Sequence, residues 1–571
     1  MTVILERLTA KVGEYTLAVK AGTLSLDVSR APHVSGTITL AWPAPAIAAA
    51  LDPRYTPAPR VTVTAETTTA WGVNAHREFN LSVRDRSVQH REGQMVLTLA
   101  SDESLLADYA PLADDETPYS LATSLRAVVN YALGKAIPGA TLAGTPAVDA
   151  DVTPYADSVN LITDPSVEGG GTIYVGTNCT VDRADTTWKA VGTRCINLYA
   201  VTSTDSYASI SGDVGGMRLG MTAGRTYVLS ATGRVKTGYP VGGTAGGNAR
   251  RLVAFWKLGS TYYTAQSPAL PTTQGIQTRV SVRFTIPEGA TEAFVRVYNG
   301  HTVGEVQWDA FRLSEYTGDP ADTAYYDGAT PATPGYAYAW TGPVNGSTSK
   351  RTALISRSID LMRWKAGVDA LRFLAPMIQA AGLRLVCDEA RVWTLRPVDY
   401  QASGALSFRA GVNIIDADDV ISRDENEWCD AAVVVYTWIG TDGRTLTAVD
   451  AFSLSATPSR VVRLERSTPY PGPGLAAYTV HRAQQRGRVV TVETPTVWTA
   501  RAETPLQIIL DGAPTQIGTV TAVTFDLGEA SMTVTARTTD TPASAWVLIP
   551  TGERWIDSPV GGSWISEVIN G

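Results

Sequence analysis

Apolar and polar residues alternate along much of residues 1–152, as they do at Leu24, Leu26 and Val28. A period of two is typical of half-buried antiparallel strands. The first clear helical spacing covers Ser120 to Ala136, and Pro138-Gly139 should end that helix. The pattern therefore predicts an N-terminal β-domain that contains one helix.

Residues 158–316 carry short alternating runs that are separated by glycine-rich turns, notably Gly242 to Asn248. About eight short strands with such turns are typical of a two-sheet sandwich or jelly roll. The composition changes on both sides of this region, so we interpret it as a β-module inserted into a different protein. The clearest strand candidates are Cys195 to Tyr199, Thr226 to Val235, Leu252 to Leu258, Arg279 to Ile286 and Ala293 to Tyr298.

The chain after the module divides into three further segments. Residues 317–350 combine Pro, Gly and Thr with several aromatics, which predicts an extended linker that is docked rather than free. Residues 351–545 return to strand patterns, with a helix at Val368 to Ala381 that contains Pro376 and is followed by Gly382. Residues 546–571 contain Trp555 and Trp564 but little periodicity, and are interpreted as a C-terminal arm.

Composition narrows the possible functions. The chain has 571 residues, 44% of them hydrophobic, with a net charge of −8 that is spread without long runs. This excludes general disorder and argues against nucleic-acid binding, which normally requires a basic face. No apolar run is long enough to span a membrane, and residues 1–10 do not resemble a signal peptide. We therefore expect synthesis in a cytoplasm and no stable membrane insertion.

Catalytic signatures are missing from the sequence. It has no HExxH zinc motif, no GxSxG elbow and no Walker motif, so we predict that the protein is not an enzyme. A glycosidase needs only two suitably spaced carboxylates, which a sequence cannot reveal. Hydrolysis therefore stays open as an alternative. Cys179 and Cys195 both lie in the inserted module and could pair, although cytoplasmic synthesis disfavours disulfides.

The segments that flank the module resemble the tail-tip (baseplate) hub family, the minor tail proteins of long-tailed actinobacterial phages. The resemblance rests on Asp27-Val28-Ser29-Arg30 with Ile38 to Pro43, on Tyr326-Asp327-Gly328 with Tyr338 to Gly342, and on Ala380 to Glu389 followed by Trp393-Thr394-Leu395. It implies a mostly β, multi-domain fold with β-barrel hub domains. It also implies a virion protein of the tail tip, usually a homotrimer, that contacts the distal tail and other tail-tip proteins.

The inserted module is similar to the carbohydrate-binding jelly rolls of bacterial glycanases. Its opening residues, Asn160 to Gly169, and its closing residues, Val306 to Leu313, carry this resemblance. Members of that family often hold a structural calcium, and the resemblance places Glu168 and Asp309 as its carboxylate ligands. Backbone carbonyls would have to supply the remaining oxygens. Val167 and the single Asp309 depart from the family pattern.

Sugar recognition uses aromatic rings that stack on pyranose faces, together with polar side chains that bind hydroxyls. Since Trp256 follows Phe255 in an alternating strand, one of these two must face the core. The candidate glycan-binding residues are Trp188, Trp256, Tyr262, Tyr263 and Tyr298.

These observations favour a structural hub of the phage tail tip whose module helps to bind glycans of the host cell surface. Two alternatives stay open: a tail-associated wall hydrolase, and a module that is purely architectural.

Overall fold

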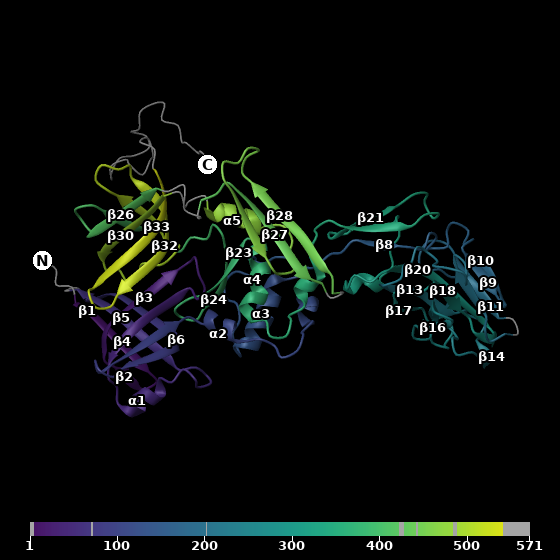
Figure 1. Ribbon diagram of the computed structural model, residues 1–571, viewed down its shortest axis with the longest axis horizontal. Helices are drawn as coiled ribbons and strands as arrows, with labels where there is room; N and C mark the ends of the chain where they lie inside the picture. The colour runs from purple at the N-terminus through teal and green to yellow at the C-terminus, as the bar shows by residue number, and fades with distance from the viewer. Residues whose placement is uncertain are drawn as a thin grey trace. The chain divides into compact units, whose positions relative to one another are not determined.

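The structure is a computed structural model that describes residues 5–69, 72–200, 203–421, 428–440, 443–483 and 488–540. It divides into two compact units, one of Met1–Thr153 with Asp360–Gly571 and the other of Pro154–Ile359 (Figure 1). Strands dominate both units, which confirms the prediction of a mostly β, multi-domain fold with an inserted β-sandwich. The predicted arm at residues 546–571 lies outside the described residues.

A 13-stranded sheet organises the first unit. Its main path is β2-β1-β5-β6-β7-β4-β3-β32-β33-β30-β26, and β31 joins β25 to β32. The early and late parts of the chain meet where β3 pairs with β32, with Leu24 opposite Phe525. The strands are β1 (Leu5–Val12), β2 (Tyr15–Leu17), β3 (Val19–Asp27), β4 (Val34–Ala41), β5 (Arg60–Thr69), β6 (Gly72–Gln89), β7 (Gln94–Ala100), β25 (Leu406–Arg409), β26 (Asp416–Ile421), β30 (Arg488–Pro495), β31 (Pro505–Ile509), β32 (Gln516–Asp526) and β33 (Ser531–Asp540).

The described strands of this sheet do not form a closed barrel, because the path begins at β2 and ends at β26 without a pairing between them. In this respect the structure differs from the barrels that the family resemblance implies. The alternating apolar residues nevertheless face inward as predicted. Leu24, Leu26 and Phe525 are all buried in one core. Trp498 stacks on Phe525 there, with ring centroids 4.8 Å apart.

A helical layer belongs to the same unit. Trp364 stacks on Phe373 of α4 at a centroid distance of 5.0 Å, and both rings lie in a core shared with α3. Asp369 caps α4 by accepting a hydrogen bond from the amide of Arg372, and Gly382 beyond its end has a positive φ of 71°. The elements are α1 (Pro45–Ala50), α2 (Glu103–Asp108), η1 (Thr117–Leu121), α3 (Leu125–Ala136), η3 (Ile359–Met362), α4 (Ala370–Ala380), β23 (Leu383–Cys387) and β24 (Trp393–Pro397).

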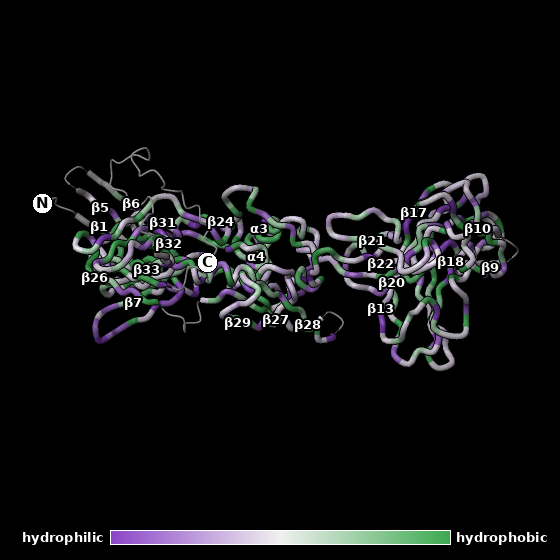
Figure 2. Tube along the Cα trace, turned by 90° about the horizontal axis from the view of Figure 1, so that it is seen from above, coloured by the Kyte–Doolittle hydropathy of each residue, from purple (hydrophilic) through white to green (hydrophobic). Residues whose placement is uncertain are grey.

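A separate three-stranded sheet follows in the order β28-β27-β29. Val434 and Tyr436 of β27 point toward α5 and are fully buried against it. These strands are labelled in Figure 2, where the chain is coloured by hydropathy. The elements are β27 (Ala431–Ile439), β28 (Thr445–Ser453), β29 (Val461–Arg466) and α5 (Leu475–Ala483).

The second unit contains the inserted module, a sandwich of two five-stranded sheets. The first module sheet has the order β10-β11-β20-β13-β17, and the second has the order β16-β15-β18-β12-β9. One apolar core lies between them. The strands are β9 (Tyr174–Thr177), β10 (Cys179–Asp185), β11 (Cys195–Ala200), β12 (Tyr207–Ile210), β13 (Arg225–Val235), β14 (Gly242–Ala245), β15 (Leu252–Leu258), β16 (Thr261–Gln266), β17 (Thr278–Ile286), β18 (Glu292–Tyr298), β19 (His301–Val303) and β20 (Glu305–Glu315).

The stretch interpreted as a linker contains regular structure of its own. Strands β21 (Tyr336–Trp340) and β22 (Ser349–Ala353) form a three-stranded sheet with β8 (Ser158–Asn160), the first strand of residues 158–316. The 3-10 helix η2 (Pro320–Thr323) lies between the module and β21 in the sequence. These elements belong to the same compact unit as the module.

Cys179 and Cys195 are both free thiols. Among the helices that the structure describes, none is both long enough and apolar enough to cross a membrane.

Candidate functional site

The outward side of the first module sheet carries a cluster of largely buried polar side chains. Leu229 and Ala231 of β13 point into the core, so the alternation turns Arg234 outward on the same strand, and Lys236 follows directly. Strands β10, β11 and β20 add further polar side chains beside them. We call this surface the polar face and define it by Asp185, Asn197, Arg234, Lys236, Glu305 and Gln307.

Lys236 is the centre of the polar face. Its Nζ lies 3.0 Å from a carboxylate oxygen of Asp185 and 3.0 Å from one of Glu305. Burial by itself would lower the pKa of Lys236, but the hydrogen bonds to Glu305 and Asp185 outweigh it and raise that pKa. For Asp185, burial opposes ionisation, but hydrogen bonds from Thr187 and Lys236 lower the carboxyl pKa. Lys236 and Asp185 are therefore both held in their charged forms.

Amide side chains connect the ion pairs to one another. Gln307 donates from Nε2 to Asp185 at 2.9 Å and accepts at Oε1 from Nε of Arg234 at 2.8 Å. Asn197 donates from Nδ2 to Glu305 at 2.6 Å. Because the charges of Arg234 and Lys236 equal those of Asp185 and Glu305 in number, the polar face as defined is neutral as a whole. Its side chains are fixed by one another, which preorganises the surface.

Aromatic rings border the polar face. The guanidinium of Arg234 lies 5.1 Å from the ring centroid of Trp188, and the indole N–H of Trp188 donates to Gln277 at 3.4 Å. The ammonium of Lys236 lies 5.5 Å from the ring of Tyr199 and 5.1 Å from that of Tyr239. Tyr239 is 51% exposed. Rings held beside a fixed set of hydrogen-bonding groups are the combination that a sugar ring requires.

The outward surface of the second module sheet carries Tyr262 and Tyr298. Tyr262 is 42% exposed and its hydroxyl donates to Glu292 at 2.8 Å, whereas Tyr298 is only 1% exposed. Arg296 lies between the aromatic rings of this surface, 4.1 Å from the centroid of Tyr207, and makes a bidentate pair with Asp213 at 2.7 and 2.9 Å. Tyr298 therefore has no open ring face on this surface.

Trp256 and Tyr263 face the other way. They lie opposite each other in the pairing of β15 with β16, and their rings stack at 6.2 Å. Trp256 also stacks on Phe284 of the first module sheet at 6.3 Å, so its ring lies on the core side, while Tyr263 is 46% exposed at the sandwich edge. The structure thus brings Trp256 and Tyr263 together but does not gather the five predicted aromatic residues on one surface, and of the five only Trp188 lies at the polar face.

Sequence reasoning missed the polar face with its Lys236 ion pairs, and it also missed Tyr199 and Tyr239 at the border of that face. The alternation along Arg225–Val235 does indicate that Arg234 faces opposite to Leu229 and Ala231. The other members of the polar face lie together because β11 and β13 both pair with β20. This pairing joins positions about a hundred residues apart in the sequence. No local signal in the sequence reports that pairing.

Glu168 and Asp309, the predicted calcium ligands, both accept hydrogen bonds from the loop at residues 190–194. Glu168 accepts hydrogen bonds from the amides of Thr193 and Arg194, the latter at 2.9 Å, and Asp309 accepts from the amides of Ala190 and Val191 at 2.8 and 3.0 Å. Burial first, and then the charge of Glu168, raise the pKa of Asp309 to about 7.

The negative charge of these two carboxylates suits a hard cation, because neither carboxylate forms an ion pair with another described residue. Glu168 and Asp309 would hold the ion, which would supply positive charge where backbone N–H groups and the hydroxyl of Thr193 now donate to the carboxylates. The described residues contain no cluster of three or more His, Cys, Asp or Glu side chains suited to a metal, so backbone oxygens would have to complete the site. Calcium binding stays a prediction.

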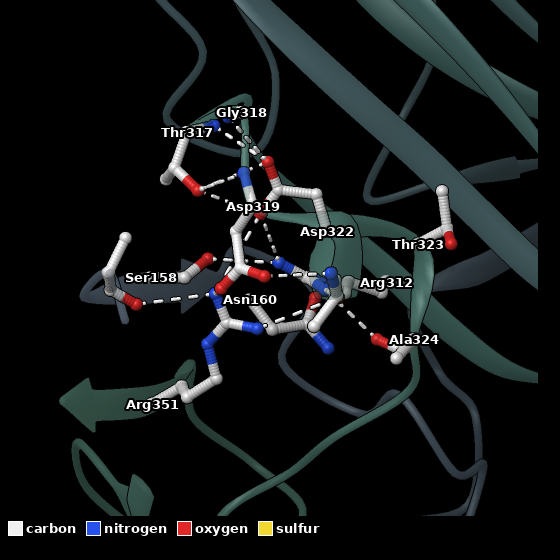
Figure 3. Close-up of polar contacts among 12 residues, drawn as sticks. Ser158, Asn160, Arg312, Thr317, Gly318, Asp319, Asp322, Thr323, Ala324 and Arg351 are labelled. Atoms are coloured by element: carbon white, nitrogen blue, oxygen red, sulfur yellow. Dashed lines mark hydrogen bonds and ion pairs between the residues drawn. The ribbon is translucent and has the colours of Figure 1, made fainter. Parts of the chain in front are cut away.

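A buried network, here called the clasp, joins the module to the segment that follows it (Figure 3). Arg312 of β20 pairs with Asp322 at 3.2 Å, and Arg351 of β22 pairs with Asp319 at 2.8 Å, all with side chains at most 5% exposed. The ring of Tyr326 lies 4.8 Å from the guanidinium of Arg312 and 5.6 Å from that of Arg351. Tyr326 is thereby docked, as the aromatic content of this stretch predicts.

No protein-family model matches the chain, and no curated protein matches it. Among solved structures, it is similar to the tail protein from Neisseria meningitidis MC58, at 8% identity over 94% of this chain and 97% of that one, with a TM-score of 0.36. It is also similar to the 43 kDa tail protein of prophage MuSo2 from Shewanella oneidensis, at 7% identity over 93% and 98% of the two chains, with a TM-score of 0.34.

Part of the chain is similar to the CBM22-1 xylan-binding domain from Paenibacillus barcinonensis Xyn10C, at 11% identity. This match covers 28% of this chain and 92% of that domain, with a TM-score of 0.21. Since these identities and TM-scores are low, function is inferred from the residues of the chain itself. The predicted actinobacterial source is not tested by these likenesses.

Proposed function

We propose that the protein is a non-enzymatic structural component of a phage tail tip and that its module binds glycans of the host cell wall through the polar face. The first unit would connect the tail tube to distal tip proteins and assemble as a homotrimer, as the sequence resemblance implies. The module would add weak attachment at each copy, and several copies would raise the overall avidity.

The observation that carries the glycan-binding proposal is the polar face with Trp188 and Tyr239 at its border. Its buried charges are paired within the face, as Lys236 is with Asp185 and Glu305. Such groups are fixed before a ligand arrives, so little ordering entropy remains to oppose binding. Exposed Tyr239 offers apolar ring surface, and Arg234, the one half-buried member of the polar face, is the polar group that would meet a sugar hydroxyl from solvent.

The test is a pull-down of the full chain on purified walls of candidate hosts. Trp188→Ala and Tyr239→Ala should each lower the bound fraction, because each removes a ring from the border of the polar face. Tyr263→Ala is the matched control, since Tyr263 has a similar exposure of 46% but lies away from that face. Equal loss in all three variants, or no wall binding by the wild type, would contradict the assignment.

The same wall preparations distinguish the alternatives. Release of soluble wall fragments by the wild-type chain would favour a hydrolase. Absence of both binding and release on every wall tested would leave the module as architecture.

A further inference from the structure

Lys236 and Asp185 come from strands that are not neighbours in the first module sheet. Two strands separate β10, which ends at Asp185, from β13, which ends at Val235. Lys236 follows β13 directly, and its side chain reaches the carboxylate at the end of β10. The contact therefore joins two parts of the module, 51 positions apart in the sequence, that backbone pairing does not connect.

The amine and the carboxylate are held against each other and shielded from water. Nζ of Lys236 lies 3.0 Å from Oδ2 of Asp185, and the two side chains are 11% and 2% exposed. The rings of Tyr199 and Tyr239 lie 5.5 and 5.1 Å from the same nitrogen. Reacting groups that are fixed in contact behave as if their concentration were very high, with effective molarities of about 10⁵–10⁸ M.

A second carboxylate is placed to carry protons. Oε2 of Glu305 also lies 3.0 Å from Nζ of Lys236, and the Glu305 side chain is 8% exposed. Nδ2 of Asn197 donates to the same oxygen at 2.6 Å, which fixes its position. Amide formation requires the nitrogen to lose protons and the departing oxygen to gain them. A carboxylate in hydrogen-bond contact with the nitrogen can act as base and then as acid.

The other oxygen of Asp185 is surrounded by donors. The amide of Thr187 donates to Oδ1 at 2.7 Å, and the hydroxyl of Thr187 donates to it at 2.6 Å. Addition of the amine to Cγ places negative charge on this oxygen, and fixed donors stabilise such charge. Oδ1 is therefore the oxygen that stays in the amide, and Oδ2, which faces Lys236, is the one that leaves.

We propose that an isopeptide bond forms between Lys236 and Asp185, with Glu305 as the proton carrier. The ammonium first passes one proton to Oδ2 along their hydrogen bond, and the neutral amine adds to Cγ. Glu305 then takes a second proton from the nitrogen and delivers it to Oδ2. The bond between Cγ and Oδ2 breaks, one water departs, and Glu305 is again a carboxylate.

One ammonium and one carboxylate thus give one amide and one water, so the reaction needs no oxidant, cofactor or ligand and does not depend on glycan binding. The product joins the end of β10 covalently to the end of β13 across two intervening strands. Pulling on the module could then not separate these strands, because the link is a covalent bond.

The first experiment measures the intact mass of the full chain. The wild type should be lighter by one water than Lys236→Arg, after correction for the substitution. Arginine keeps a cation beside both carboxylates, but its guanidinium stays protonated and does not attack. Glu305→Gln should likewise keep its full mass, because the proton carrier is gone. Lys257→Met is the control, since Lys257 pairs with Glu292 on the second module sheet at 2.9 Å, and it should lose water as the wild type does.

The second experiment locates the bond by tryptic digestion. Acylated Lys236 is not cleaved, so the wild type should yield Ala184–Lys189 joined to Val235–Arg250, and Lys236→Arg should yield no joined peptide. Circular dichroism establishes that each variant is folded. A wild type of full mass, water loss that persists in Glu305→Gln, or loss of ammonia with a link to the Asn197 peptide would each overturn the proposal.

Discussion

Arg351 offers the sharpest test of whether the segment after the module is a folded part of that unit or a tether. Its guanidinium is 2% exposed, pairs with Asp319 at 2.8 Å and lies 4.3 Å from the ring of Tyr336. The substitution Arg351→Met keeps much of the volume and removes the charge. Asp319 then retains the amide of Ala321 at 2.8 Å and the hydroxyl of Tyr336 as partners, but has lost its nearest cation.

Removing one partner of a buried ion pair costs about 3–5 kcal/mol, because the remaining charge stays buried without compensation. No discount for solvent screening applies here, since both side chains are at most 5% exposed. Lys350→Met is the matched control one residue away. Lys350 pairs with Asp157 at 3.3 Å, but these side chains are 45% and 57% exposed, so its loss should cost less than about 1 kcal/mol.

Hydrogen exchange of the β21 and β22 amides in the full chain measures this cost directly. A loss of 3–5 kcal/mol in the opening free energy corresponds to exchange that is roughly 150- to 4,000-fold faster. Adding Asp319→Asn to Arg351→Met should recover part of the protection, because the uncompensated charge is then gone. Exchange in Arg351→Met within about threefold of the wild type would refute the reasoning and show that the clasp does not hold these strands.

Other predictions concern pH, calcium and a turn beside the polar face. Burial lowers the pKa of His33 to about 4. Its neutral form therefore adds stability above pH 6.5 that is lost as pH falls toward 4, roughly 3 kcal/mol, and the difference in unfolding between wild type and His33→Gln over that range should show it. The pKa of Asp309 is raised to about 7, so the stability from its buried neutral form is present below its unfolded value and is lost as pH rises through 7. Millimolar calcium should raise the unfolding temperature at pH 8, and Asp309→Asn should abolish that rise; no calcium effect in the wild type would contradict the predicted site. Gly304 has a φ of 99°, and an added Cβ would lie 2.4 Å from the carbonyl oxygen of Pro240. Gly304→Ala should displace the neighbouring Tyr239 and reduce wall binding more than it reduces the far-ultraviolet circular dichroism signal.

The alternation of apolar residues was enough to predict the β-rich fold and the presence of an inserted sandwich. It also predicts that one of Phe255 and Trp256 faces the core, and the structure turns Trp256 inward toward Phe284. The period of two does not state which set of residues faces inward. Tyr262 and Tyr263 are therefore equivalent in the sequence, although the register places them on opposite sides of β16.

Residues 317–350 show why the sequence alone could not predict where this segment packs. Pro, Gly and Thr indicate an extended chain, and the aromatics indicate docking, but neither identifies the surface that receives them. Tyr326 lies against Arg312 and Arg351, one before it in the sequence and one after it. In the sequence, Arg351 lies after the module and resembles an ordinary charged strand residue. Its role becomes evident only from the pairing of β22 with β8 in the structure.

The pairing of β8 with β22 has a consequence for how this protein could acquire or exchange its inserted unit. Ser158 lies opposite Arg351, so the chain enters and leaves the module at neighbouring backbone positions. An insertion whose two ends lie side by side can be replaced by another cassette with the same end-to-end spacing, while the fold that carries it stays intact. Recombination at this boundary would exchange the whole inserted unit in one step, and the same boundary is where a different module should be grafted in a chimera.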